Sequence, residues 1–192
     1  VYTVGSQITE MLCHHEKLDK KAARARCIQM LADLGIPNPE ERFDQYPHEF
    51  SGGMKQRAMI AIAMICNPHI LIADEPTTAL DVTIQAQILD LIRKMQEQHG
   101  TSVILITHNM GIVAEIADDV AVMYMGRVVE FGTLEQIFTN PTHPYTKALM
   151  KSVPVLGMNK DQELETIDGT TPDASTVFTG CEFADRCTCA KP

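Results

Sequence analysis

The sequence lacks tryptophan, has few other aromatic residues and contains no long apolar run. Its longest unbroken apolar stretch, residues 58–66, is well short of the roughly 20 residues that a membrane-spanning helix needs. We therefore expect any link to a membrane to go through a partner protein. Basic residues are also scarce, because 16 lysines and arginines face 25 aspartates and glutamates, for a net charge of −9. Such a composition argues against a general nucleic-acid binder, which needs a basic surface to neutralise phosphates.

An initiating methionine and a signal segment are absent as well. The chain starts at Val1, and no charged segment followed by an apolar one comes next. We therefore interpret the sequence as a fragment, truncated at its N-terminus. Of the six cysteines, three lie in apolar or helical sequence, where we expect small core residues in a reducing compartment, namely Cys13, Cys27 and Cys66. The others crowd the last twelve residues, namely Cys181, Cys187 and Cys189.

Short apolar runs alternate with helical patterns through the middle of the chain. Residues 70–73 and 103–106 have the pattern of buried parallel strands, and an amphipathic helix from Val82 to His99 separates them. A third strand is expected at 119–125, followed by a turn and a hairpin partner at 127–131. This alternation predicts an α/β fold with a largely parallel sheet.

The character of the sequence changes after Asn140. Only one short helix is expected beyond this point, and residues 154–179 show little periodicity. We therefore divide the chain into a partial α/β domain, residues 1–139, and a C-terminal accessory extension, residues 140–192.

The first apolar strand ends in Asp74-Glu75-Pro76. The carboxyl end of a parallel strand is where α/β folds bind ligands. An aspartate there can hold Mg²⁺ through water, and a glutamate beside it can orient and deprotonate the water that attacks a γ-phosphate. On an extended strand end the two neighbouring side chains diverge, so that each can face a different group. The alternative is that both acids are solvated loop or helix caps.

A second candidate site is Ser51-Gly52-Gly53, which opens an almost wholly apolar helix. The two glycines let backbone N–H groups approach an anion closely, the serine offers a hydroxyl, and the helix directs its positive end to the same place. The alternative is a serine N-cap followed by flexible glycines. Lys55 and Arg57 on the same helix are plausible phosphate contacts, although a solvated helix face explains them as well.

Together these features resemble the ABC ATPase family. Four elements appear in the family's order: the signature motif at residues 51–53, the Walker B strand at 70–75, the D-loop at 78–81 and the switch histidine at 108. The spacing is 23 residues from Ser51 to Asp74 and 34 from Asp74 to His108. Met54 departs from the glutamine that usually follows the signature glycines.

The resemblance implies catalytic roles at two strand ends. Glu75 would be the general base for ATP hydrolysis, and Asp74 would hold the Mg²⁺ ion through water. His108 would contact the γ-phosphate, sensing it and holding the transition state. The implied cofactors are therefore ATP and Mg²⁺.

The resemblance also implies a head-to-tail dimer. Ser51, Gly52 and Gly53 would bind the nucleotide of the opposite site, closing over an ATP held by the partner's phosphate loop. Asp81 would couple the two sites. The implied partners are a second ABC ATPase subunit, identical or related, two membrane permease subunits and, indirectly, an extracytoplasmic solute-binding protein, with no nucleic acid. The implied location is peripheral, at the cytoplasmic face of the plasma membrane.

One element of the family is missing from these residues. No Gly-x-x-x-x-Gly-Lys-Ser/Thr sequence occurs among them. In the family this Walker A loop and the Q-loop precede the signature, and residues 4–11 resemble the sequence just after the Q-loop. We therefore expect this chain alone to be inactive as an ATPase.

The C-terminal sequence narrows the resemblance to one branch. Residues 140–149, followed by Ser152-Val153-Pro154, resemble the C-terminal extension of ATP-binding subunits from bacterial oligopeptide, dipeptide and nickel importers. The implied function is ATP hydrolysis coupled to uptake of oligopeptides or dipeptides. The alternatives are a nickel or other small-solute importer of the same branch, an ABC ATPase acting outside transport, and an inactive fragment.

The cysteine-rich end resembles the same branch. Residues 180–187 are similar to the start of a segment in which four thiolates can hold a [4Fe–4S] cluster. Cys181 and Cys187 match that pattern, whereas Cys189 does not obviously match it. The resemblance implies a possible cluster in the complete protein and incomplete ligation in this chain.

Overall fold

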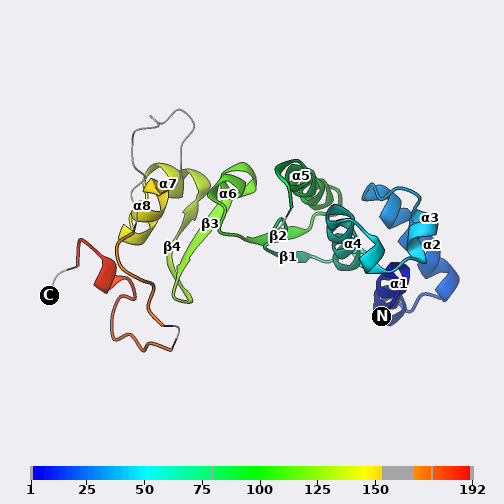
Figure 1. Cartoon of the computed structure of the whole chain (residues 1–192), viewed down its shortest axis with the longest axis horizontal. Helices are drawn as coiled ribbons and strands as arrows, with labels where there is room; N and C mark the ends of the chain where they lie inside the picture. The colour runs from blue at the N-terminus through cyan, green and yellow to red at the C-terminus, as the bar shows by residue number, and fades with distance from the viewer. Residues whose placement is uncertain (1, 79, 153–166, 174, 191–192) are drawn as a thin grey trace. The chain divides into compact units, whose positions relative to one another are not determined.

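A computed structural model describes residues 2–78, 80–152, 167–173 and 175–190. The chain divides into two compact units, Val1–His108 and Asn109–Pro192. The described residues of the first unit form, in order, α1 (Val4–His15), α2 (Lys20–Asp33), α3 (Pro39–Phe43), the short 3₁₀ helix η1 (Pro47–Glu49), α4 (Gly52–Met64), β1 (Ile70–Asp74), α5 (Val82–His99) and β2 (Ser102–Ile106). Helices α1 to α3 gather at its N-terminal end, coloured blue to cyan in Figure 1.

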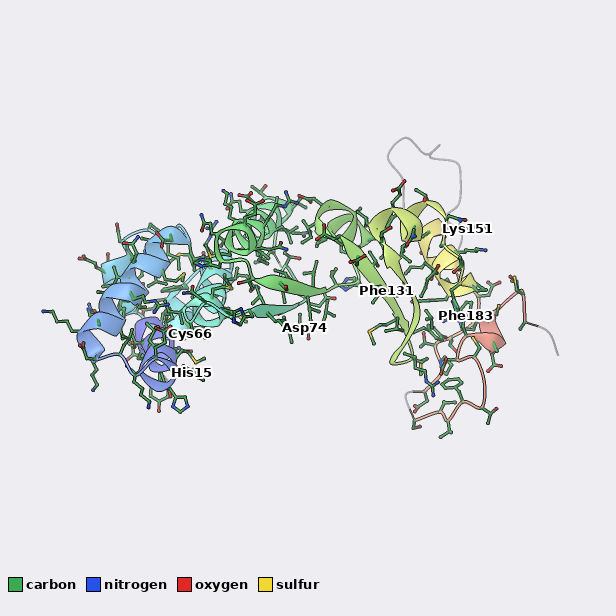
Figure 2. All side chains as sticks on the ribbon, turned by 180° about the vertical axis from the view of Figure 1, so that it is seen from behind. His15, Cys66, Asp74, Phe131, Lys151 and Phe183 are labelled. Carbon is green, nitrogen blue, oxygen red and sulfur yellow. The ribbon has the colours of Figure 1, made fainter. Side chains whose placement is uncertain are left out.

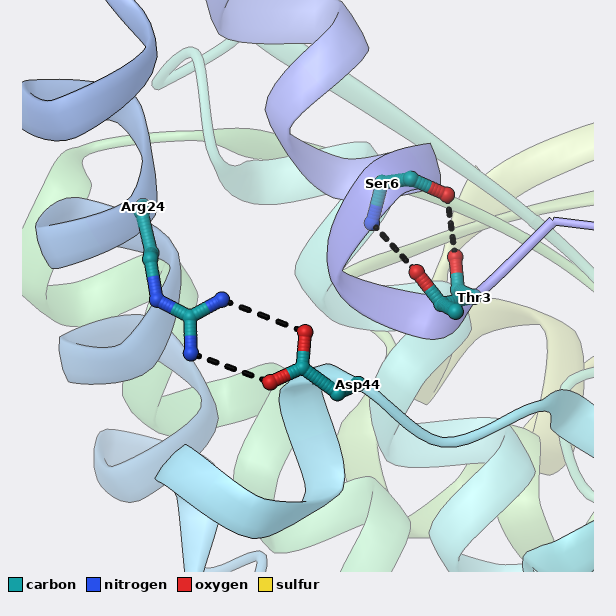
Figure 3. Close-up of polar contacts among 4 residues, drawn as sticks. All are labelled: Thr3, Ser6, Arg24 and Asp44. Atoms are coloured by element: carbon teal, nitrogen blue, oxygen red, sulfur yellow. Dashed lines mark hydrogen bonds and ion pairs between the residues drawn. The ribbon is translucent and has the colours of Figure 1, made fainter.

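Polar contacts and ion pairs help to fix this helical end. The Thr3 hydroxyl accepts the Ser6 N–H at 3.3 Å, and the Ser6 hydroxyl donates to the Thr3 carbonyl at 2.7 Å (Figure 3). The Arg24 guanidinium forms a bidentate pair with Asp44 at 3.1 and 3.2 Å (Figure 3). The same guanidinium lies over the Phe43 ring, 4.0 Å from its centroid. The loop after α3 is thereby tied to the face of α2.

The core of the first unit lies between α1, α2, α4 and α5. Each of these helices contributes apolar side chains that are removed from solvent, among them Ile8, Leu12, Leu31, Met64 and Ile88. The predicted helix at Val82–His99 has the bounds of α5, and Gly100 ends it at a positive φ of 64°. Cys27 is buried, as the sequence predicted, while Cys13 and Cys66 are half-buried.

Strands β1 and β2 pair in parallel, with Ile70 opposite Ser102 and Asp74 opposite Ile106. The predicted α/β fold class is confirmed. The sequence predicted that both strands are buried, but in the part of the chain that the structure describes only one face of the pair is buried. Leu71 and Ala73 are buried, whereas the alternate side chains are 48–64% exposed, namely Ile70, Ile72, Ile104 and Ile106. The apolar runs therefore hide only one face here, because side chains alternate between the two faces of a strand.

The second unit is built around an antiparallel hairpin. Its order is α6 (Met110–Ile116), β3 (Asp119–Tyr124), β4 (Arg127–Thr133), α7 (Leu134–Thr139), α8 (Pro144–Lys151) and the 3₁₀ helix η2 (Ala184–Arg186). The predicted third strand and its hairpin partner are confirmed, and β3 pairs with β4 rather than extending the parallel pair. Helices α7 and α8 pack on the hairpin through Ile137, Tyr145 and Leu149. The division at residues 139 and 140 stays a prediction.

None of the described helices is both long enough and apolar enough to cross a membrane.

Candidate functional site

The end of β1 places Asp74 and Glu75 beside the end of β2. Asp74 is the last residue of the strand and is exposed (Figure 2). Glu75 continues the ladder, because its N–H donates to the Ile106 carbonyl at 2.9 Å. Its backbone then leaves the strand, with φ at 47°. The prediction of extended backbone at both residues is therefore wrong for Glu75, which adopts the left-handed conformation that only a few per cent of non-glycine residues occupy.

This turn brings Glu75 against His108, two residues beyond the end of β2. The Nδ1 atom of His108 lies 2.7 Å from Oε1 of Glu75, and the His108 N–H donates to the same oxygen at 3.2 Å. The other carboxylate oxygen, Oε2, accepts from the Thr78 hydroxyl at 3.1 Å. The hydrogen bond with His108 is the largest effect on the carboxyl group, and it lowers the pKa of Glu75 below its ordinary value. Glu75 is therefore ionised at neutral pH.

Both members of this pair are accessible to a substrate. The side chain of His108 is 85% exposed and that of Glu75 is 35% exposed. Because Nδ1 faces an ionised carboxylate, Nδ1 is the ring nitrogen that donates to Glu75, and Nε2 points away from this contact. The structure thus brings together two residues that the sequence selected from separate strand ends. It adds Thr78, to which the sequence reasoning gave no role of its own.

Asp74 shares a strand face with Ile72. Among the described residues, no three His, Cys, Asp or Glu side chains gather at one point. A lone exposed carboxylate at a strand end fits a Mg²⁺ ion that keeps most of its waters, because Mg²⁺ is usually held by one or two carboxylates together with substrate phosphates.

Ser51 is the N-cap of α4, as the alternative interpretation of that motif expected. Its hydroxyl accepts the Met54 N–H at 3.4 Å. The N–H groups of the first helical turn and the positive end of α4 therefore lie next to the glycines, an arrangement that suits an anion. The capping role and an anion-binding role are compatible, since a serine hydroxyl can both accept and donate.

The two glycines of this motif differ in the room around them. A Cβ atom at Gly53 would lie 2.9 Å from Cγ2 of Ile84, on the first turn of α5. A Cβ atom at Gly52 would lie 3.5 Å from Cδ2 of Leu80, which is ordinary contact. Gly53 is therefore needed for the close approach of α4 to α5, whereas Gly52 is not.

Asp81 caps α5 and lies in the loop between the two candidate sites. Its Oδ1 atom accepts the Ile84 N–H at 2.9 Å. Of the predicted D-loop, Ala79 lies outside the described residues, and the remaining residues connect Glu75 to the first turn of α5. The coupling role of Asp81 stays a prediction.

Arg57 makes structural contacts. Its guanidinium donates to the Leu34 carbonyl and, at 3.1 Å, to the side-chain carbonyl of Gln87. It thereby ties α4 to the end of α2 and to α5. A cavity of about 230 Å³ beside it is lined by residues of these three segments and includes neither Glu75 nor His108.

Glu130, on β4, fastens the start of α8. Its carboxylate accepts the Thr142 N–H at 2.6 Å, the Thr142 hydroxyl at 2.7 Å and the His143 N–H at 3.1 Å. Burial alone would raise the pKa of Glu130, but the hydrogen bonds that its carboxylate accepts lower it to about 2. The resulting stabilisation is present above the unfolded value and is lost as pH falls through the folded one. The Pro-bounded segment before α8 is thus held in place at any pH near neutrality.

The cysteine-rich end docks onto this unit through Phe183. The ring is 2% exposed and packs against the rings of Tyr124 and Tyr145, with both centroids at 5.4 Å. Figure 2 labels this residue. Nearby, the Arg186 guanidinium donates to the Tyr124 hydroxyl at 3.3 Å and to backbone carbonyls of residues 167–169 at 2.8–3.2 Å. Sequence periodicity could not reveal this docking, because it depends on a single large apolar residue.

Cys181 and Cys189 are exposed and Cys187 is half-buried. The Cys189 N–H donates to Sγ of Cys187 at 3.4 Å. The described residues assemble no set of three ligands, so they do not by themselves fit an iron–sulfur cluster. The ligand role of Cys181 and Cys187 stays a prediction.

Replacing Phe183 by alanine is expected to release the cysteine-rich end from the hairpin. Loss of a buried phenylalanine typically costs about 3–5 kcal/mol, so amide exchange in residues 181–190 should accelerate by about 100-fold or more. Hydrogen exchange read by mass spectrometry measures this rate. Val177→Ala is the matched control, because Val177 belongs to the same end and is 89% exposed. Unchanged protection in Phe183→Ala would contradict the docking.

Two family models match the chain. The family described as ABC transporter matches residues 2–78, and the family described as oligopeptide/dipeptide transporter, C-terminal region, matches residues 129–192. The dipeptide transport ATP-binding protein DppD of Bacillus subtilis is 59% identical over 185 residues, which is 96% of this chain and 55% of that protein.

Other relatives agree. The oligopeptide transport ATP-binding protein OppD of Bacillus subtilis is 55% identical over 183 residues, covering 95% of this chain and 51% of the relative. A putative peptide import ATP-binding protein of Brucella melitensis is 51% identical over 195 residues, covering 99% of the chain and 58% of the relative. The chain thus spans about half the length of these relatives.

Proposed function

Because the chain belongs to the family of ABC transporter ATP-binding subunits, we propose that the protein hydrolyses ATP to power peptide uptake. The observation that carries the proposal is the contact of 2.7 Å between Glu75 and His108 at the ends of two paired parallel strands. An ionised carboxylate on an exposed strand end, with a histidine beside it, suits deprotonation of a water molecule next to a terminal phosphate.

The residues then act as follows. Glu75 accepts a proton from the attacking water, whose oxygen attacks the γ-phosphorus as ADP departs. His108 holds Glu75 through Nδ1 and offers Nε2 toward the γ-phosphate, which requires this nitrogen to be protonated while the phosphate is bound. Asp74 would hold Mg²⁺ through water, and the ion would supply charge neutralisation for the phosphates.

A second nucleotide contact comes from the N-terminus of α4. Ser51, Gly52 and Gly53 offer a hydroxyl and backbone N–H groups to the γ-phosphate of an ATP held by the partner subunit. We propose a head-to-tail pair of ATPase subunits, identical or related, in which Asp81 couples the two sites. The pair works on two membrane permease subunits at the cytoplasmic face of the plasma membrane, and a solute-binding protein delivers the solute.

Peptides are the proposed solute class, supported by the match of residues 129–192 and by the names of the relatives. The test is ATP hydrolysis by the complete subunits, assembled with their permeases in nanodiscs. Addition of the solute-binding protein loaded with a dipeptide or oligopeptide should stimulate hydrolysis several-fold, and Ni²⁺ should not. Stimulation by Ni²⁺ instead would assign the protein to metal uptake. If a folded binding protein delivers both solutes and neither changes the rate of ATP hydrolysis, peptide import is contradicted.

A further inference from the structure

Thr78 is joined to Glu75 twice. Its hydroxyl donates to Oε2 of the glutamate at 3.1 Å, and its backbone N–H donates to the Glu75 carbonyl at 3.2 Å. The backbone bond closes a turn that begins at the left-handed Glu75, and the turn places the hydroxyl over the carboxylate. The side-chain contact is therefore built into the local fold.

The two oxygens of the carboxylate have different partners. Oε1 is held by His108 and Oε2 by Thr78. The terminal torsion of a glutamate is broad, because it joins an sp³ carbon to an sp² carbon. Hydrogen bonds to one oxygen leave the carboxylate plane free to rock about this torsion. A donor on the second oxygen fixes the plane, and with it the direction in which the remaining lone pairs point.

We propose that Thr78 is a positioning residue for Glu75, which fixes the carboxylate plane for proton abstraction from the attacking water. This inference rests on the proposed function, in which Glu75 is the base. Thr78 itself touches neither water nor nucleotide in this role, and it acts only through the glutamate.

The test compares Thr78→Val, which keeps the shape but removes the hydroxyl, with Thr78→Ser, which keeps the hydroxyl. In the complete ATPase assembled with its permeases, Thr78→Val should lower kcat about tenfold, the order expected for loss of one positioning hydrogen bond. The KM for ATP should change less than about twofold, because no nucleotide contact is removed. Thr78→Ser should retain most of the activity. Thr139→Val, an exposed threonine of α7, is the control for the same chemical change elsewhere.

Two results would overturn the inference. Thr78→Val with a kcat like that of the unmodified protein would show that the hydroxyl does not matter, and Thr78→Ser as slow as Thr78→Val would show that shape rather than the hydrogen bond matters. Glu75→Gln, measured alongside, separates this failure from that of the proposed function. An inactive Glu75→Gln with a normal Thr78→Val removes only the role of Thr78, whereas an active Glu75→Gln removes both. Because Thr78 is exposed, Thr78→Val is expected to fold, and Thr78→Ala serves as a second variant without the hydroxyl.

Discussion

Replacing Glu75 by glutamine is expected to lower ATP turnover of the complete, partnered protein by about 10²–10⁴-fold, the usual cost of losing a general base. Glutamine keeps the size of the side chain, and its amide oxygen can accept from His108 in the place of Oε1, while its amide nitrogen faces the Thr78 hydroxyl, which can accept. It cannot take the proton of the attacking water. Binding of ATP should survive, because the change removes no phosphate ligand.

The ATPase rate and nucleotide-dependent dimerisation, measured together, distinguish this from a folding defect. Binding without hydrolysis should trap the closed dimer. Asp74→Asn should differ by weakening the Mg²⁺ dependence, and His108→Ala should lower turnover with little change in nucleotide affinity. Glu97→Gln, on an exposed position of α5, is the matched control for the same chemical change. Near-normal hydrolysis in Glu75→Gln would require the base to lie elsewhere.

Replacing Gly53 by valine is expected to destabilise the first unit by about 1–3 kcal/mol, the typical cost of forcing extra methyl groups into a packed contact. A Cβ atom at this position would already lie 2.9 Å from Cγ2 of Ile84, and a β-branched side chain on a helix cannot easily rotate away. The midpoint of thermal unfolding, followed by circular dichroism of the complete protein, should fall by several degrees.

A double-mutant cycle tests the cause. Ile84→Ala opens the space next to position 53, so Gly53→Val combined with Ile84→Ala should be less destabilised than the sum of the two single changes. Gly52→Ala is the neighbouring control, because a Cβ atom there has 3.5 Å of room. It should leave stability nearly unchanged or slightly improved, since alanine favours helix over glycine. Equal destabilisation at the two glycines would refute the packing argument.

Local patterns were enough to predict the elements around the site. The bounds of α5, the strand ending at Asp74 and the hairpin after Asp119 all follow from periodicity and turn residues, which act over a few positions. Local patterns were not enough to predict the contact between Glu75 and His108. It depends on the parallel register between β1 and β2, a contact across 33 residues that composition and periodicity do not encode. The family resemblance gave both residues roles at the γ-phosphate but did not predict their contact.

The parts that the sequence did not predict depend on unusual backbone or on single side chains. The role of Thr78 requires a left-handed glutamate, and a glutamate in the sequence does not signal a positive φ. The hydrogen bonds from Thr142 and His143 to Glu130 join strand β4 to the start of α8, twelve residues further along the chain. A threonine three residues after an acidic strand end is the one local signal that could have pointed to Thr78, since such short side chains often bond back to nearby groups.

The bare face of the β1–β2 pair has a practical consequence for handling the protein. Four isoleucine side chains, those of Ile70, Ile72, Ile104 and Ile106, stand together on the side of the strands that carries Asp74. An exposed apolar patch of this kind promotes association between protein molecules. Sulfate strengthens this association because the ion is excluded from the protein surface. Purification of this chain therefore calls for buffers low in such salts, and precipitation with ammonium sulfate should begin at low saturation.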